Sequence, residues 1–81
     1  TTWELGSSLI VGRASICDIV VDDLELSRQH FCLESDNGNV FITDLGSTNG
    51  TSVNGIGIAG KRRLNPVDMV EACSMKFTIR W

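Results

Sequence analysis

The stretch HFCLESDNGNVFITD, residues 30–44, contains two short apolar-rich runs on either side of Asn37-Gly38. Runs of this length that are bounded by turn residues are typical of β-strands. An Asn-Gly pair supplies the positive φ angles that a tight hairpin turn requires. Residues 30–44 therefore predict two antiparallel strands, over 30–34 and 40–44, joined by a turn.

The rest of the chain repeats this pattern of short apolar runs between turn residues. A second Asn-Gly pair, Asn54-Gly55, separates runs at 51–53 and 56–58. Residues 67–76 are the only helix candidate, but their β-branched valines favour a strand. Many short strands with turns between them predict an antiparallel β-sandwich and exclude a βαβ fold. Further strands are predicted at residues 9–11, 19–21, 67–70 and 77–81, the last with Phe77, Ile79 and Trp81 on one face.

The chain has 81 residues, of which 42% are hydrophobic and 21% are charged, and its net charge is -3. This size predicts one domain over residues 1–81, and we expect it to belong to a larger protein, with its N-terminal strand trimmed. A core this small favours binding over catalysis. The acidic balance argues against non-specific binding to nucleic acid or to an anionic membrane, which requires positive charge. Any bound anion must therefore be held by a local group of residues.

The three cysteines, Cys17, Cys32 and Cys73, are odd in number and never form a C-x-x-C pair. This spacing supports neither a disulfide framework nor a zinc site. We expect reduced thiols in the core, no metal and no cofactor. Residues 1–12 lack the features of a signal peptide, and no apolar run approaches the roughly 18 residues of a membrane span. These features predict a cytoplasmic protein, or a nuclear one in a eukaryote.

Two segments imitate catalytic or nucleotide-binding motifs. Residues 55–61 match glycine-rich nucleotide loops, but Arg62 stands where Ser or Thr would reach a magnesium ion, and Pro66 cuts short the helix that such loops open. Ser27 and His30 have the residue types of a nucleophile and its base, yet a spacing of three in an extended chain puts them on opposite faces. The sequence therefore predicts that the domain is not an enzyme.

Three of the seven basic residues are consecutive, at Lys61–Arg63. One interpretation is a solvated turn whose charge keeps a sheet edge from pairing with other chains. The other is a contribution to an anionic ligand or to the acidic surface of a partner.

Four short motifs remain, in chain order Gly12-Arg13, Ser27–His30, Ser47–Thr51 and Asn54-Gly55. In this order and at these spacings they resemble the forkhead-associated (FHA) domain, whose pattern is G-R, S-R/N-x-H, S-x-N-G-T and N-G. Beyond them, Leu64–Asp68 is similar to the L-x-x-G-D segment of that family, with Pro-Val in place of the glycine. The resemblance therefore covers nearly all of the chain.

The resemblance implies an all-β fold, an FHA-type β-sandwich of about eleven short, mostly antiparallel strands in two sheets, with peptide-binding loops at one end. It also implies a phosphothreonine-dependent peptide-binding module that mediates protein–protein interaction in Ser/Thr-kinase signalling. The expected partner is a phosphothreonine-containing protein or peptide. By this resemblance the residues that contact the phosphopeptide are Arg13, Ser27, Arg28, Thr48 and Asn49.

The chemistry of phosphothreonine agrees with these roles, because the group carries about -1.5 to -2 charge and three acceptor oxygens. Arg13 would donate charge-assisted hydrogen bonds, Ser27 a hydroxyl hydrogen with its backbone N–H nearby, and Arg28 a second cationic contact. By family analogy, Thr48 lines the pocket for the phosphate and the methyl group, and Asn49 holds the peptide main chain through its side-chain amide. The residues expected to support the binding loops are Gly12, His30, Ser47, Gly50 and Asn54.

The alternative is a phospho-independent structural or assembly domain, as in a bacterial secretion apparatus or an oligomerisation unit. Such a domain would keep the fold but would not need phosphate chemistry. Because Arg13, Ser27 and Asn49 are all present, the sequence favours phosphothreonine binding.

Overall fold

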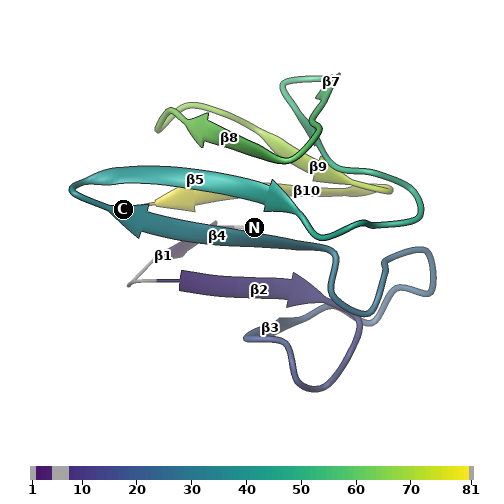
Figure 1. The fold of residues 1–81 in the computed structure, drawn as a ribbon. Helices are drawn as coiled ribbons and strands as arrows, with labels where there is room; N and C mark the ends of the chain where they lie inside the picture. The colour runs from purple at the N-terminus through teal and green to yellow at the C-terminus, as the bar shows by residue number, and fades with distance from the viewer. Residues whose placement is uncertain (1, 5–7, 81) are drawn as a thin grey trace.

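The computed structural model describes residues 2–4 and 8–80, with side chains over 8–79. Within these residues the chain forms ten strands and no helix, arranged as two five-stranded sheets (Figure 1). The predicted all-β sandwich of mostly antiparallel strands is therefore confirmed. In the same residues there is accordingly no apolar helix of membrane-crossing length.

The first sheet has the strand order β3-β2-β4-β5-β8, and the second has the order β1-β10-β9-β6-β7. The pairs β1–β10 and β2–β3 are parallel, and the other pairs are antiparallel. The strands of the first sheet are β2 (Ser8–Gly12), β3 (Ile19–Val20), β4 (Phe31–Asp36), β5 (Asn39–Asp44) and β8 (Lys61–Leu64). Those of the second are β1 (Thr2–Glu4), β6 (Ser52–Val53), β7 (Ile56–Gly57), β9 (Val70–Ala72) and β10 (Met75–Arg80).

The hairpin of β4 and β5 is the longest pairing in the first sheet and forms where the sequence predicts it. Its register runs from Phe31 opposite Asp44 to Asp36 opposite Asn39. The turn has φ angles of 51° at Asn37 and 80° at Gly38, as an Asn-Gly turn requires. Local turn chemistry thus sets the register of the two central strands.

The core lies between the two sheets, where apolar side chains from both meet. Phe31 of β4 and Phe77 of β10 make an edge-to-face contact with ring centroids 5.5 Å apart. Alternate side chains are buried over the first part of each strand, Phe31 and Leu33 on β4 and Val40 and Ile42 on β5, which is the pattern of strands with one face on a core. Trp81, which the sequence places on the face of Phe77 and Ile79, lies outside the described residues. The buried cluster comprises Val11, Leu26, Phe31, Leu33, Val40, Ile42, Val53, Leu64, Val70, Ala72, Phe77 and Ile79.

The predicted strand at 67–70 is wrong over most of its length. Residues 65–68 form a turn in which the Asp68 N–H donates to the Asn65 carbonyl at 3.0 Å, and Val67 is 90% exposed. Strand β9 begins only at Val70. The prediction took Val67 for a buried strand residue because it is apolar, but its side chain lies in solvent.

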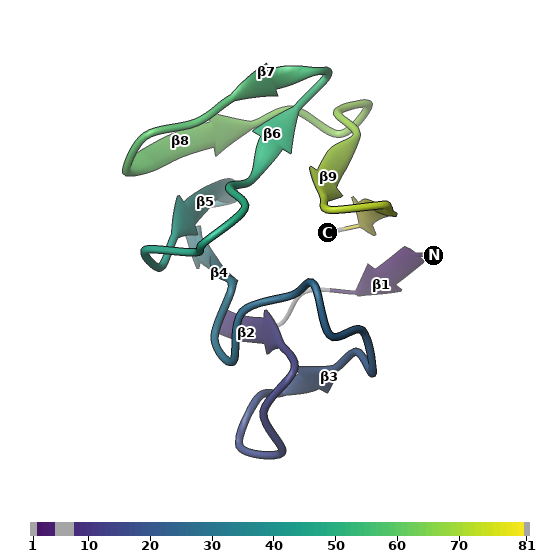
Figure 2. The same ribbon diagram turned by 90° about the vertical axis from the view of Figure 1, so that its right-hand side faces the viewer.

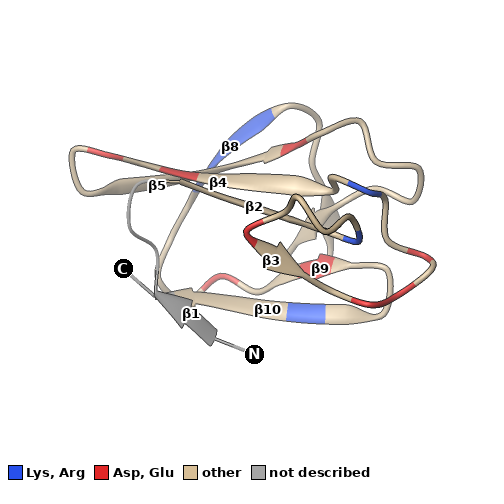
Figure 3. Cartoon of the chain, turned by 90° about the horizontal axis from the view of Figure 1, so that it is seen from below, with Lys and Arg blue, Asp and Glu red and all other residues tan. Residues whose placement is uncertain are grey.

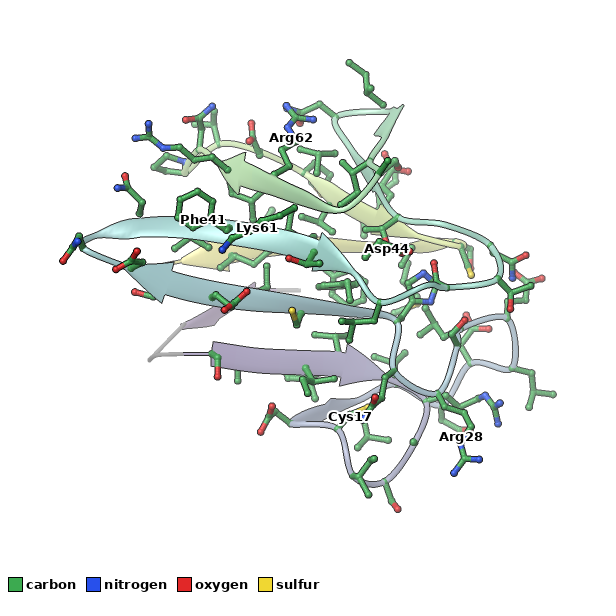
Figure 4. All side chains as sticks on the ribbon, viewed as in Figure 1. Cys17, Arg28, Phe41, Asp44, Lys61 and Arg62 are labelled. Carbon is green, nitrogen blue, oxygen red and sulfur yellow. The ribbon has the colours of Figure 1, made fainter. Side chains whose placement is uncertain are left out.

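The basic run Lys61–Arg63 belongs to the edge strand β8 and is not a turn. Residues 61–64 pair antiparallel with 40–43 of β5, so the run carries backbone hydrogen bonds on one side. The Lys61 ammonium lies over the Phe41 ring, 4.9 Å from its centroid (Figure 4). The charge does occupy a sheet edge, where charged side chains hinder pairing with other chains.

All three cysteines are free, as predicted, but only Cys17 is buried. Cys32 and Cys73 are half-buried, so neither is a fully buried core thiol, although Cys73 packs against the core cluster. Burial and the nearby carboxylate of Glu34 raise the pKa of the Cys32 thiol.

The carboxylate of Asp68 links the turn between β6 and β7 to the turn between β8 and β9. It accepts hydrogen bonds from the Asn65 N–H and from the Asn54 side-chain amide, both at 2.9 Å. The Asn54 side-chain oxygen in turn accepts the Met69 N–H at 2.9 Å. The hydrogen bond from the Asn65 backbone is the main cause that lowers the pKa of Asp68. Asp68 is buried and Asn54 is exposed, so these hydrogen bonds join two turns at the margin of the core.

Gly12 is packed against the backbone of the segment before β4. A Cβ at this position would overlap the Arg28 carbonyl oxygen and would lie 3.0 Å from the Gln29 Cα. Because both are backbone atoms, they cannot rotate away. We expect Gly12→Ala to lower the free energy of unfolding by about 1 to 3 kcal/mol in urea denaturation. Gly57→Ala is the matched control, since a Cβ at Gly57 meets nothing within 4 Å, and equal stability of the two variants would contradict the close approach.

Asp68 also predicts how stability depends on pH. Its pKa is lower in the folded protein than in the unfolded chain, so the carboxylate stabilises the fold above the unfolded pKa of roughly 3.9. This stabilisation is lost as the pH falls through the folded pKa. Asp68→Asn places an amide donor against one of the two donors, Asn54 or Asn65, and we expect it to cost about 1 to 3 kcal/mol at neutral pH.

The same variant should lose less stability than the unaltered domain when the pH is lowered below about 4. Urea denaturation across the acid range measures this difference. Parallel acid profiles for the two proteins would show that Asp68 does not contribute to the pH dependence.

Candidate functional site

The candidate site lies at the end of the sandwich where β2 ends and β4 begins (Figure 1). Figure 2 views this end, where the segment between β3 and β4 lies beside the segment between β5 and β6. A hollow of about 320 Å³ opens between these segments and the residues after β2. The hollow is lined by Arg13, Leu24, Glu25, Leu26, Ser27, Arg28, Thr48 and Asn49. The structure therefore brings all five residues that the sequence predicts as peptide contacts to one hollow.

Arg13 reaches the hollow from the end of β2 and is held in place by backbone. Its N–H donates to the Ser27 carbonyl at 3.0 Å, and its side-chain Nε donates to the Leu26 carbonyl at 3.2 Å. The Nε bond orients the guanidinium plane without using the two terminal nitrogens. Those N–H groups suit a bidentate contact with an anion.

Ser27 connects two of the segments through its hydroxyl. The Oγ accepts the Thr48 N–H at 3.0 Å, so its hydrogen can be donated elsewhere. The Ser27 N–H donates to the His30 Nδ1 at 3.1 Å. This N–H, which we expect near the phosphate, is thus already bonded within the protein, and the hydroxyl is the donor that Ser27 has left for a ligand.

His30 is fully buried and joins the segment before β4 to the segment before β6. A backbone N–H can only donate, so the Nδ1 that receives it carries no proton. The Nε2 then carries the ring hydrogen and donates to the Gly50 carbonyl at 2.8 Å. Ser27 and His30 are thus in contact rather than on opposite faces, because residues 27–30 are not an extended strand.

Asp44 organises the segment between β5 and β6, and sequence reasoning missed it. Its carboxylate accepts hydrogen bonds from the Gly46 and Ser47 N–H groups at 3.1 Å and from the Thr51 hydroxyl at 2.7 Å. The Ser47 hydroxyl donates to the same side chain. Burial alone would raise the pKa of Asp44, but these donors outweigh it and lower the pKa. An Asp that opens a Gly- and Ser-rich stretch is a typical Asx-turn residue, which was the available signal.

Thr48 and Asn49 are exposed at the tip of this segment, and Gly50 follows with a φ of 82°. The Asn49 side-chain nitrogen donates to the Glu25 carbonyl at 2.8 Å. This bond uses one N–H of the amide that the resemblance assigns to the peptide main chain. The same nitrogen also donates to the Cys73 sulfur at 3.7 Å, so the side-chain oxygen is the group that can still pair with a peptide.

Arg28 has an exposed side chain, and its backbone is fixed on the inner side (Figure 4). The Arg28 carbonyl accepts the Ala14 N–H at 3.0 Å and the Cys17 thiol at 3.0 Å. Close packing of Gly12 permits this contact. The main chain of residue 28 is therefore rigid while its guanidinium is free to follow a ligand.

Other sequence-based candidates lie elsewhere or are absent from the lining. Asn54 bonds to Asp68 and Met69, so it holds the β6–β7 turn rather than the hollow. The basic run Lys61–Arg63 on β8 contributes no residue to the lining. Over the described part of the chain, no three His, Cys, Asp or Glu side chains cluster as metal ligands would.

Charge at this end is mixed rather than uniformly positive, as basic and acidic positions lie together there in Figure 3. Arg13 and Arg28 line the hollow, and Glu25 lines it as well. An anion would therefore be held by these particular guanidinium groups and not by a general positive field.

The sequence is similar to known proteins that contain one kind of domain. The family model of the FHA domain matches residues 9–73. An FHA domain-containing protein of Arabidopsis thaliana, At4g14490, is 43% identical over 53 residues, which are 64% of this chain and 14% of that protein. The transcriptional regulatory protein EmbR of Mycobacterium tuberculosis is 34% identical over 70 residues, which are 86% of this chain and 18% of EmbR. The chain thus spans less than a fifth of these relatives.

Two solved structures have the same fold. EmbR in complex with a low-affinity phosphopeptide superposes with a TM-score of 0.85 at 33% identity, covering 89% of this chain and 19% of EmbR. The FHA domain of FhaA, complexed with the intracellular domain of Rv3910, gives a TM-score of 0.84 at 28% identity, covering 91% of this chain and 81% of that one. With the family model matched over most of its length, the chain belongs to the FHA domain family.

Proposed function

We propose that this domain binds phosphothreonine-containing peptides and mediates protein–protein interaction in Ser/Thr-kinase signalling. The observation that carries the proposal is the hollow of about 320 Å³, where Arg13, Ser27, Arg28, Thr48 and Asn49 meet from three separate segments. The phosphopeptide complex of EmbR, which has the same fold, supports it.

The donors in the hollow suit a phosphate group on an extended peptide. Arg13 offers its terminal N–H groups, Ser27 offers a hydroxyl hydrogen, and the exposed Arg28 adds a second cation. Hydrogen bonds to a charged group are worth about 1.5 to 3 kcal/mol each. Three of them with peptide contacts, less the cost of association, give about -8 kcal/mol, which corresponds to micromolar affinity. Such affinity is suited to reversible signalling.

Hydrogen bonds within the protein hold the segments around the hollow together. His30 ties the segment of Ser27 to Gly50, and Asp44 ties Gly46, Ser47 and Thr51 to the end of β5. A preorganised site avoids paying the ordering entropy on binding. Residues that touch no ligand therefore contribute to affinity.

We propose binding without catalytic turnover. A serine nucleophile needs its hydroxyl hydrogen-bonded to a base, as in the Ser-His pair of hydrolases. Here His30 accepts the backbone N–H of Ser27 and donates to Gly50, so neither ring nitrogen is available to the Ser27 hydroxyl. The same contact that braces the hollow thus argues against activation of Ser27.

Titration of matched threonine and phosphothreonine peptides into ¹⁵N-labelled domain tests the proposal by NMR. We expect only the phosphopeptide to shift the backbone amides around Arg13, Ser27 and Asn49. Arg13→Ala should weaken binding by about 2 to 5 kcal/mol, because the phosphate would be left desolvated and poorly paired.

Lys61→Ala is the matched control, since it removes an equal charge from β8, which does not line the hollow. Equal binding of the two peptides, or equal effects of the two substitutions, would contradict a phosphate-specific site. If no peptide from a broad phosphothreonine library binds the folded domain, the phospho-independent structural role becomes the better account.

A further inference from the structure

Cys73 has an unusual backbone conformation for its residue type. It is the first of two residues that join β9 to β10, and its φ is 57°. The two other described residues with positive φ that are not glycine, Asn37 and Asn54, are asparagines, which tolerate this region. Cysteine has no such tolerance, so Cys73 is strained. Strain of this kind persists only where the surroundings hold the residue, and it tends to occur at functional sites.

The thiol of Cys73 is held at the edge of the candidate site. It donates to the Glu25 carbonyl at 3.1 Å, across 48 residues of sequence. The Asn49 side-chain nitrogen donates to the same carbonyl oxygen at 2.8 Å and to the Cys73 sulfur at 3.7 Å. One carbonyl oxygen thus joins the β9–β10 turn, the segment before β4 and the segment before β6.

Asn49 borders two hollows, and Cys73 borders one of them. The second hollow, of about 240 Å³, is lined by both residues together with Glu71 of β9 and positions of β6, β7 and the segment before β6. Asn49 also lines the larger hollow with Arg13 and Ser27. A substitution at Cys73 would therefore alter the larger hollow through the Glu25 carbonyl and the Asn49 side chain, without a direct contact to Arg13 or Ser27.

We propose that Cys73 is a positioning residue for peptide binding, whose thiol fixes the Glu25 carbonyl and with it the Asn49 side chain. The inference rests on the proposed phosphopeptide function. Glycine at this turn would relieve the strain but would supply no donor for Glu25. The strained conformation is retained because it places a donor at the carbonyl on which Asn49 depends.

Serine and alanine at position 73 isolate the donor, since both keep the left-handed strain and only serine can donate. With a phosphothreonine peptide that binds the unaltered domain, calorimetry should find Cys73→Ser within about twofold of it. Cys73→Ala should bind roughly three- to tenfold more weakly. Alanine binding as tightly as the unaltered domain would overturn the proposal.

Cys73→Gly separates positioning from folding. Relief of strain offsets the lost thiol contact and the greater freedom of glycine in the unfolded chain. We expect its melting temperature to equal or exceed that of the unaltered domain while its affinity falls with that of Cys73→Ala. Affinity that simply follows melting temperature across the three variants would make Cys73 a structural residue only.

A readout without peptide keeps this inference distinct from the proposed function. Hydrogen exchange of the Asn49 side-chain amide should be slow in the unaltered domain and in Cys73→Ser, and faster in Cys73→Ala and Cys73→Gly. If the unaltered domain binds no phosphopeptide, the proposed function fails, and this measurement still tests the positioning of Asn49. Identical exchange in all four proteins would overturn the inference.

Discussion

The two hydrogen bonds of the buried His30 ring are the interaction on which the binding end depends. The ring accepts the Ser27 N–H and donates to the Gly50 carbonyl, so it fixes one segment against the other from inside the protein. A neutral imidazole offers one acceptor and one donor on a rigid plane, which few other side chains can do. Its edge-to-face contact with Phe31 anchors it to the core. Positions of the Ser27 hydroxyl and of residues 48–50 follow from this arrangement.

Polar side chains hold together the parts of this small domain that apolar packing cannot reach. Asp44 gathers the segment before β6, and Asp68 with Asn54 joins turns at β6–β7 and before β9. These three side chains accept hydrogen bonds from backbone N–H groups that would otherwise lack partners in the turns. Among the described side chains, no buried nitrogen or oxygen lacks a hydrogen-bond partner. The sandwich core sets the ends of the strands, and these polar groups set the shape of the site.

Features that depend on neighbouring residues were predictable from the sequence, whereas those that depend on distant partners were not. The β4–β5 hairpin followed from Asn37-Gly38 because turn chemistry is local. The edge strand at Lys61–Arg63 did not, because it becomes a strand by pairing with β5. The motif spacing identified residues that the fold brings to one hollow. It could not reveal that Asn49 and Cys73 share the Glu25 carbonyl, since those contacts span 24 and 48 residues.

The protonation of the His30 ring tests most directly whether the site is built in advance of its ligand. Long-range ¹H–¹⁵N NMR of the peptide-free domain at neutral pH distinguishes the two ring nitrogens. The account predicts the hydrogen on Nε2 and an unprotonated Nδ1, because the Ser27 N–H needs an acceptor there. A hydrogen on Nδ1 would break the bond to Ser27 and would contradict the account, since the loops would then have no common brace before a peptide binds.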